Sequence, residues 1–419
     1  MHVRKLSIHN IKCFQKSEFS FANDNGNTIA KWVNIIGENA TGKTTVLQSI
    51  ALLIGGEPLW GFFFKELTSY WPRQNSHMSQ LSASIKENDD NLWEYGFFIR
   101  NQSITFADIY NKTPKGFSAA YGAFRRLSRK EFSPLIEFQE QGIRANFITL
   151  FDEDTPLTTF NQWISSLDYR SVKGDMAARR KLESGLSALS LLLPGGVEFD
   201  RSALDNDGQI RFIAQGTSVP TYALSDGYRS VLALGGDLIW RLINAFPDSE
   251  DPMKEEGVVL IDELDIHLHP RWQAWIAQKL RSAFPNIQFI VATHSPLVAM
   301  GAYWNGETGE LRDDVLTLKL EINDGKASVQ RIDDDLAAMD INRALESPAF
   351  GMVAPRPPEV EKKIDRYDEL LEVEQRTAAE ETELQKLQRF MAEVRPIGGK
   401  PAPGSFEAKL EDYLREKLG

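Results

Sequence analysis

The segment that most constrains this chain is Gly37 to Thr44, which matches the pattern G-x-x-x-x-G-K-[ST] at every fixed position. The residues before it, Trp32 to Ile36, form a short apolar run typical of a buried strand, and those after it, Val46 to Leu53, predict a helix. In this strand–loop–helix order, backbone N–H groups and the positive end of the helix dipole converge on an anion. The sequence therefore predicts a site for a nucleoside triphosphate.

Each residue type in this loop has an expected role. Gly37 and Gly42 allow the backbone to wrap tightly around a phosphate. The Lys43 ammonium is expected to contact the β- and γ-phosphates, and the Thr44 hydroxyl to bind Mg²⁺. We predict the following nucleotide-binding residues here: Gly37, Glu38, Asn39, Ala40, Thr41, Gly42, Lys43, Thr44 and Thr45.

A second apolar run, Gly257 to Ile261, ends in two adjacent carboxylates. Such an uninterrupted run is typical of a strand buried on both faces of a parallel sheet. Asp262, at the strand end, is expected to hold Mg²⁺ together with Thr44. Glu263 is then placed to orient or deprotonate the attacking water, which makes it the predicted catalytic base. An amphipathic helix and another apolar strand, Gln288 to Thr293, complete a β-α-β unit.

Composition excludes several classes of protein. The chain has 419 residues, 42% hydrophobic and 25% charged, as in ordinary soluble globular proteins, which allows two or three domains or one with an insertion. It contains no apolar run long enough to span a membrane. The N-terminus, Met1 to Ile8, alternates like a strand and does not resemble a signal peptide. A single cysteine, Cys13, allows no internal disulfide and fits a cytoplasmic protein.

The net charge of −12 argues against a protein that coats nucleic acid over its whole surface. A local basic patch remains a candidate for nucleic-acid contact. Its residues are Arg125, Arg126, Arg129 and Lys130. Short basic clusters are commonly solvated faces, so both interpretations stay open at this stage.

The tail differs from the rest of the chain. A charged run from Glu359 to Val394 predicts an amphipathic helix or a helical hairpin, and a last short helix is expected from Phe406 to Leu418. The tail either packs against the rest of the chain or docks a partner. The expected parts are a nucleotide-binding portion at 1–54, an inserted central mixed α/β lobe at 55–220, the rest of the nucleotide-binding portion at 221–330, and the helical tail at 331–419.

Further motifs carry a family resemblance. The segment Leu224 to Arg229 resembles the signature L-S-x-G-x-[RQ] of ABC-type ATPases and precedes the Asp262–Glu263 pair, as in that family. His294 follows the next strand, where these ATPases carry a switch histidine. Leu264 to Pro270 is similar to the segment after the Walker B strand in RecF, SMC and OLD relatives. Together with the phosphate loop, or Walker A motif, these segments resemble the RecF/SMC/OLD-like group over about 1–54 and 221–300.

The resemblance implies a fold and a way of working. The fold would be an α/β ABC-type ATPase head, a mixed or parallel sheet flanked by helices. Two heads would sandwich ATP as a homodimer or higher homo-oligomer, with Lys43 and Glu263 from one copy and the signature residues Ser225 and Gly227 from the other. His294 would contact the γ-phosphate. For the glutamine that contacts Mg²⁺ in many ABC ATPases, Gln102 and Gln139 are weak candidates.

A narrower resemblance concerns the segments 120–126, 149–164 and 350–358, which look like the ATPases of Septu-type anti-phage systems and their retron-associated relatives. It implies an ATPase that regulates a separate effector, an HNH-type nuclease, because the sequence shows no nuclease constellation of its own. The alternative is a RecF-like DNA-repair ATPase that binds DNA directly. An ABC transporter subunit is disfavoured by the long segment between Thr44 and Leu224 and by the absence of a membrane-partner signal.

Overall fold

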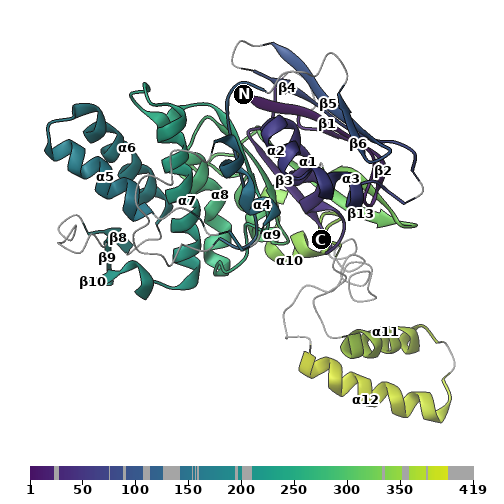
Figure 1. Cartoon of the computed structure of the whole chain (residues 1–419). Coiled ribbons are helices and arrows are strands. Elements are labelled where there is room, and N and C mark those ends of the chain that lie inside the picture. Colours follow the sequence, from purple (N-terminus) through teal and green to yellow (C-terminus); the bar gives the residue numbers. More distant parts are fainter. Residues whose placement is uncertain are drawn as a thin grey trace. The chain divides into compact units, whose positions relative to one another are not determined.

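The computed structural model describes residues 1–22, 28–74, 76–87, 91–106, 114–125, 142–152, 154–155, 157, 160–193, 197–200, 210–332, 336–351, 358–373 and 376–394. The chain divides into two compact units, Met1–Phe350 and Gly351–Gly419. The expected nucleotide site falls entirely in the first unit, which also includes residues 331–350 of the expected tail, and the second unit holds residues 351–419 (Figure 1).

A six-stranded sheet forms the centre of the first unit, in the order β14-β13-β3-β12-β11-β7. Its strands from β13 to β7 pair in parallel, and β14 joins β13 antiparallel. The carboxyl ends of β3, β12 and β11 therefore meet at one edge, where ligands bind in open α/β sheets. The bounds are β3 (Trp32–Gly37), β7 (Phe117–Tyr121), β11 (Gly257–Ile261), β12 (Ile287–Ala292), β13 (Val315–Asn323) and β14 (Lys326–Ile332). This confirms the expected fold class.

Both faces of the central sheet are buried. Side chains alternate between the two faces along each strand, so each strand contributes to two cores. On β11, Val259 and Ile261 join one hydrophobic core. Val258 and Leu260, one residue out of step, join a second core on the opposite face. The near-continuous apolar runs read from the sequence follow from this double burial.

One face of the central sheet is covered by α1 (Lys43–Gly55), which begins at the phosphate loop. The helix is buried nearly all round, and after its polar first turn it is mostly apolar. It lies between the central sheet and a five-stranded antiparallel sheet in the order β2-β1-β4-β5-β6 (Figure 1). The bounds on this side are β1 (His2–Ile11), β2 (Phe14–Ser20), β4 (Ser79–Lys86), β5 (Leu92–Arg100), β6 (Ser103–Phe106), α2 (Glu57–Phe62) and α3 (Phe64–Tyr70).

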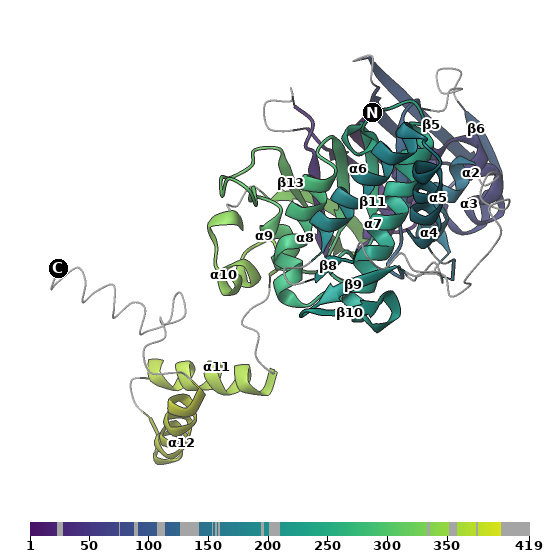
Figure 2. The ribbon, with the colours of Figure 1, turned by 90° about the vertical axis from the view of Figure 1, so that its left-hand side faces the viewer.

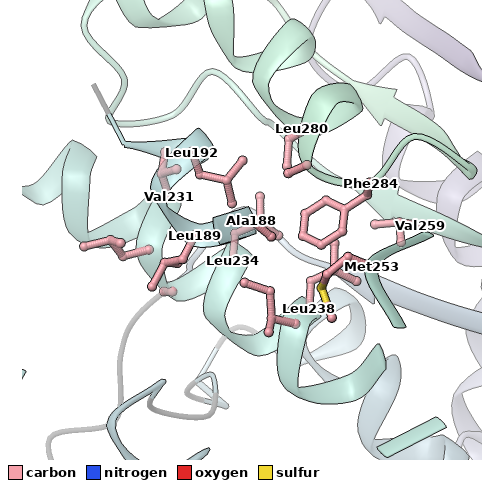
Figure 3. Close-up of a cluster of buried hydrophobic side chains, with 14 of the residues drawn as sticks. Ala188, Leu189, Leu192, Val231, Leu234, Leu238, Met253, Val259, Leu280 and Phe284 are labelled. Carbon is pink, nitrogen blue, oxygen red and sulfur yellow. The ribbon is translucent and has the colours of Figure 1, made fainter. Parts of the chain in front are cut away.

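The other face carries a layer of helices, α5 (Phe160–Val172), α6 (Met176–Leu192), α7 (Asp226–Ala245) and α8 (Pro270–Ala283), gathered on one side of the sheet (Figures 1 and 2). Figure 3 shows part of their shared core: Ala188, Leu189 and Leu192 from α6 and Val231, Leu234 and Leu238 from α7 lie in one cluster with Leu280 of α8 and Val259 of β11. Gly235 on α7 lets α6 approach closely, because a Cβ there would lie 2.2 Å from Leu192 Cδ1. The α7 helix thus shares one core with α6 and with β11, the strand that precedes the carboxylates.

Residues 55–220 contribute to several layers. They supply β4, β5 and β6 to the antiparallel sheet, β7 to the edge of the central sheet, and α5 and α6 to the helical layer. The remaining elements of this region are η3 (Ile143–Asn146), α4 (Ile148–Phe151) and a small antiparallel sheet of β8 (Val197–Phe199), β9 (Arg211–Ala214) and β10 (Thr217–Pro220).

The first unit continues to Phe350 because short helices after β14 pack on it. Leu336 and Ala349 share a small core with Ile36 of β3 and Ala299 of α9. The short helices after β14 are η6 (Leu336–Ala338) and α10 (Ile341–Glu346). Three other short helices, η4 (Thr221–Ala223), η5 (Pro252–Lys254) and α9 (Pro296–Gly301), come earlier in the chain.

The second unit contains α11 (Pro358–Glu372) and α12 (Ala378–Val394), which form a helical hairpin. Leu370, Leu384 and Leu387 form its apolar core, and Arg366 pairs with Glu383 at 3.2 Å. Of the two arrangements expected for this stretch, the structure has the hairpin. The helix expected from Phe406 to Leu418 lies outside the described residues. Among the helices of the described ranges, none is both long and apolar enough to cross a membrane.

Candidate nucleotide-binding and catalytic site

The phosphate loop joins the end of β3 to the start of α1, and its glycines are required by conformation and by space. Gly37 and Gly42 have φ of 150° and 99°, in the left-handed half of backbone space that glycine tolerates best. A Cβ on Gly37 would lie 2.5 Å from the Leu320 carbonyl oxygen, and one on Gly42 would lie 2.7 Å from the Phe14 ring. Ala40 also has a positive φ of 64°. The loop can therefore wrap at the carboxyl edge of the sheet.

Lys43 is 6% exposed and its ammonium is held inside the loop. Its Nζ donates to the carbonyl oxygens of Gly37 at 2.9 Å and Glu38 at 2.7 Å. Burial lowers the pKa of Lys43, and the neighbouring carboxylates, Asp262 first, oppose that shift. The ammonium thus sits inside the curve of the loop, where an anionic phosphate would replace the carbonyl oxygens as its partner.

Thr44 connects the loop to β11. Its hydroxyl donates to Asp262 Oδ2 at 2.6 Å, although the two residues are far apart in sequence. Asp262 is 5% exposed, and its other carboxylate oxygen, Oδ1, is buried without a hydrogen-bond partner. Burial raises the pKa of Asp262, the Thr44 hydrogen bond lowers it, and the adjacent Glu263 raises it. A buried carboxylate oxygen left open beside a threonine hydroxyl fits a hard cation such as Mg²⁺.

Glu263 follows directly and is half-buried. Its φ of 45° places it in the left-handed region, which a residue with a side chain adopts at a cost of about 1–3 kcal/mol. The next residue is fixed by a backbone hydrogen bond of 3.2 Å from Leu264 N to the Ala292 carbonyl oxygen of β12. The Glu263 carboxylate lies close enough to Lys43 and His294 to influence the pKa of both. It therefore lies within the expected site.

His294 follows β12 and is half-buried. Its backbone N–H donates to Asp265 Oδ1 at 3.2 Å, and the same oxygen accepts from the Thr293 hydroxyl at 2.5 Å. Burial lowers the pKa of His294, and the positive charge of Lys43 lowers it further. The imidazole is therefore neutral at pH 7. It can then donate one hydrogen bond without adding a charge.

The signature segment lies at the N-terminus of α7. Ser225 is exposed, has the extended backbone of an N-cap and makes no capping hydrogen bond with its side chain. Gly227 is needed because a Cβ there would lie 2.7 Å from the His267 carbonyl oxygen. None of the contacts described above connects the Ser225 side chain to the residues around Lys43. Its hydroxyl and the first N–H groups of α7 are oriented as a helix N-terminus open to an anion.

The structure contradicts the prediction that Arg125 belongs to a basic surface patch. This residue was a candidate for nucleic-acid contact, yet it is 6% exposed and donates to the carbonyl oxygens of Asp262 at 2.8 Å and Glu263 at 3.0 Å. Burial lowers its pKa to about 10, so the guanidinium is still charged at neutral pH. A surface role for Arg125 is wrong because β7 pairs in parallel with β11 and brings the arginine under the carboxylate segment. The other three residues of that patch, Arg126, Arg129 and Lys130, lie outside the described residues.

This role of Arg125 could not be predicted from the sequence, because the residues that follow it are also basic. In the structure, Arg125 comes just after β7 and Gly122, where a Cβ would lie 2.1 Å from the Thr149 carbonyl oxygen. Of the two glutamines considered for a magnesium contact, Gln102 lies in the exposed turn between β5 and β6, and Gln139 is outside the described residues.

This arrangement, with phosphate loop, carboxylate pair and histidine on neighbouring parallel strands and a signature helix packed behind them, defines the protein as an ABC-type ATPase. Within that class, the chain belongs to the family described as "AAA domain, putative AbiEii toxin, Type IV TA system", whose model matches residues 34–300.

Curated relatives agree with this assignment. The chain is 27% identical over 419 residues to a Septu protein PtuA of Bacillus mycoides (strain KBAB4), covering 99% of this chain and 54% of the relative. It is 50% identical over 86 residues to the Retron Vc95 probable ATPase of Vibrio cholerae serotype O1 biovar El Tor, covering 20% of this chain and 17% of the relative. The chain thus spans about half the length of the first relative. These matches confirm the resemblance to Septu-type and retron-associated ATPases.

Two solved structures are similar to this chain. The SMC head domain from Thermotoga maritima matches with a TM-score of 0.46 and 17% identity, covering 80% of this chain and 100% of that chain. The recombination mediator protein RecF matches with a TM-score of 0.42 and 13% identity, covering 79% of this chain and 98% of that chain.

Proposed function

We propose that this protein binds ATP with Mg²⁺ and hydrolyses it. The observation that carries the proposal is the 2.6 Å contact between the Thr44 hydroxyl and Asp262, whose second oxygen is buried and open. That contact supports Thr44 and Asp262 as a magnesium-binding pair, and Asp262 lies close enough to Lys43 to influence its pKa. Mg²⁺, when bound there, would neutralise negative charge on the β- and γ-phosphates.

The chain's own residues would divide the reaction among them. Water attacks the γ-phosphorus, the bond to the bridging oxygen breaks, and ADP and phosphate leave. The Glu263 carboxylate accepts the proton of the attacking water. Lys43 would exchange its loop carbonyls for phosphate oxygens, and neutral His294 would donate a hydrogen bond to the γ-phosphate.

The magnesium assignment makes a specific prediction. Thr44→Val removes the hydroxyl with little change of volume, so the Mg²⁺ concentration for half-maximal ATP hydrolysis should rise at least about tenfold, the equivalent of one lost charge-assisted hydrogen bond. A magnesium titration of ATPase activity at fixed total ATP measures it. The matched control is Ser49→Ala, which removes a buried hydroxyl of the same helix that donates to the Thr45 carbonyl oxygen. An unchanged magnesium dependence in Thr44→Val would refute the assignment.

We also propose that two copies close around ATP. The support is the signature end of α7, where Ser225 is exposed, lacks a capping bond and belongs to a helix of 20 residues. Ser225 and Gly227 of one copy would contact the nucleotide held by the phosphate loop of the other. Higher oligomers built from such pairs are compatible with the same contact.

For the biological role, we propose a regulator of a separate effector in anti-phage defence. The support is the similarity to Septu proteins and to a retron ATPase. The effector would be an HNH-type nuclease encoded beside this gene. The nucleotide state of the ATPase would set its activity, and the hairpin of α11 and α12 is the proposed docking element.

This role predicts co-purification and nucleotide control. A tagged chain co-expressed with the neighbouring nuclease should retain it, and the rate of DNA cleavage should change at least about fivefold between ATP and ADP, a typical coupling between two sites. In the Lys43→Ala control, which cannot hold the phosphates, cleavage should no longer depend on nucleotide. If the chain without nuclease instead retains DNA in an ATP-dependent manner that weakens steeply with salt, the RecF-like alternative holds and the effector role falls.

A further inference from the structure

Arg125 lies at the junction of three segments that the proposed reaction needs. It follows the end of β7, and its guanidinium reaches the loop after β11. Nη1 donates to the Asp262 carbonyl oxygen at 2.8 Å and to that of Gly122 at 3.1 Å, and Nη2 donates to the Glu263 carbonyl oxygen at 3.0 Å. Nε lies 3.4 Å from the Ser230 hydroxyl on α7. One side chain therefore joins the magnesium ligand, the base and the signature helix.

The geometry requires an arginine. A guanidinium is planar and carries five N–H donors in a fixed fork, so it can donate in several directions at once. A lysine ammonium is a compact point charge on a flexible stem and cannot reproduce that fork. Arg125 therefore donates to the carbonyl oxygens of Gly122, Asp262 and Glu263, and that of Glu263 also accepts from Ile266 N at 3.1 Å.

The Glu263 backbone is where this support matters. A left-handed φ of 45° at a glutamate persists only when the surroundings fix it. Three contacts do so: Arg125 and the backbone N–H of Ile266 both donate to the Glu263 carbonyl oxygen, and the N–H of Leu264 donates to the Ala292 carbonyl oxygen of β12. The direction of the Glu263 carboxylate depends on the same backbone angles.

The signature helix is tied to the same strand at a second point. The Tyr121 hydroxyl, at the end of β7, donates to Asp237 Oδ2 on α7 at 2.9 Å. Asp237 is fully buried and forms an ion pair with Arg241, whose Nη1 donates to Asn146 at 2.6 Å. Fully paired buried networks of this kind make the joined elements rigid. The helix that begins at Ser225 and the loop that carries Glu263 are thus held by one polar framework.

We propose that Arg125 is a positioning residue for ATP hydrolysis, which fixes the backbone of Glu263 and links it through Ser230 to the signature helix. The inference rests on the proposed ATPase function. It assigns Arg125 no contact with the nucleotide. Its effect should therefore appear in the rate of the chemical step and leave the affinity for ATP unchanged.

The decisive variants are Arg125→Lys and a matched control, Arg281→Lys. Arg281 on α8 is also buried, at 5% exposure, donates to the Ala302 carbonyl oxygen and pairs with Asp314, but none of these partners belongs to the site. Both variants lose the fork of a buried guanidinium, so both should lower the melting temperature. Purified full-length proteins are compared for ATP affinity, by displacement of a fluorescent ATP analogue, and for kcat and KM.

Arg125→Lys should bind ATP within about twofold of wild type and hydrolyse it at least about tenfold more slowly, whereas Arg281→Lys should retain both values. Ser230→Ala should lower kcat at least about threefold alone and have no further effect in the Arg125→Lys background, because both changes cut the same link. If Arg125→Lys does not fold, the kcat of Ser230→Ala tests the positioning role by itself. Wild-type kcat in folded Arg125→Lys, or in Ser230→Ala, would overturn the inference and leave the ATPase function standing. A wild-type protein that does not hydrolyse ATP would overturn both.

Discussion

Glu263→Gln is expected to bind ATP and almost fail to hydrolyse it. The amide has the shape of the carboxylate but cannot accept the proton of the attacking water, so kcat should fall at least about 100-fold, the usual contribution of a general base. ATP affinity should stay within a few-fold of wild type, because Lys43, Thr44 and Asp262 remain in place. Phosphate release measures the first quantity, and equilibrium binding of labelled ATP measures the second.

A matched variant separates loss of the base from loss of a negative charge near β11. Glu255 precedes the opposite end of that strand, where its carboxylate accepts from the Ser249 hydroxyl at 2.6 Å. Glu255→Gln should hydrolyse ATP at the wild-type rate. Normal turnover by Glu263→Gln would refute the assigned base, and the proton would then have to leave by another group.

Mixing two inactive variants should restore ATP hydrolysis. Lys43→Ala removes the phosphate-binding ammonium, and Ser225→Arg places a bulky cation at the exposed signature position, so each variant alone should fall below about 1% of wild type. A mixed pair, however, regains one intact site, which combines Lys43 of one copy with Ser225 of the other. Random pairing at equal concentrations should give about a quarter of wild-type activity, because half the pairs are mixed and each has one active site of two.

The control for mixing is each variant incubated with more of itself, which should stay inactive. Light scattering with ATP present should show that mixed pairs form. If such pairs form and remain inactive, the site is not shared between copies, and Ser225 has no place in the partner's site.

Much of the site could be predicted from sequence because its chemistry is local. The phosphate loop needs glycine, lysine and threonine within eight consecutive positions, Gly37 to Thr44, so the motif and its geometry coincide. The strand before Asp262 could be read because burial on both faces leaves an unbroken apolar run. A parallel sheet then brings the ends of β3, β11 and β12 together, which places Thr44 beside Asp262 as expected.

The part that could not be predicted depends on contacts between distant segments. Arg125 looked like a member of a surface basic patch, since its neighbours in sequence are also basic. Its partners Asp262 and Glu263 lie far along the chain and reach it only because β7 pairs with β11. The buried pair of Asp237 and Tyr121 is hidden in the same way, inside a helix and a strand that read as ordinary elements.

The sequence by itself determined the local chemistry of the proposed nucleotide site, because Gly37 to Thr44 and the Asp262–Glu263 pair carry it in short consecutive patterns. Only the tertiary structure decided how these patterns are supported. The pairing of β7 with β11 and the packing of α7 on the sheet bury Arg125 beneath the catalytic segment. Burial and hydrogen-bond partners arise from the path of the whole chain, so no local pattern of residues contains them.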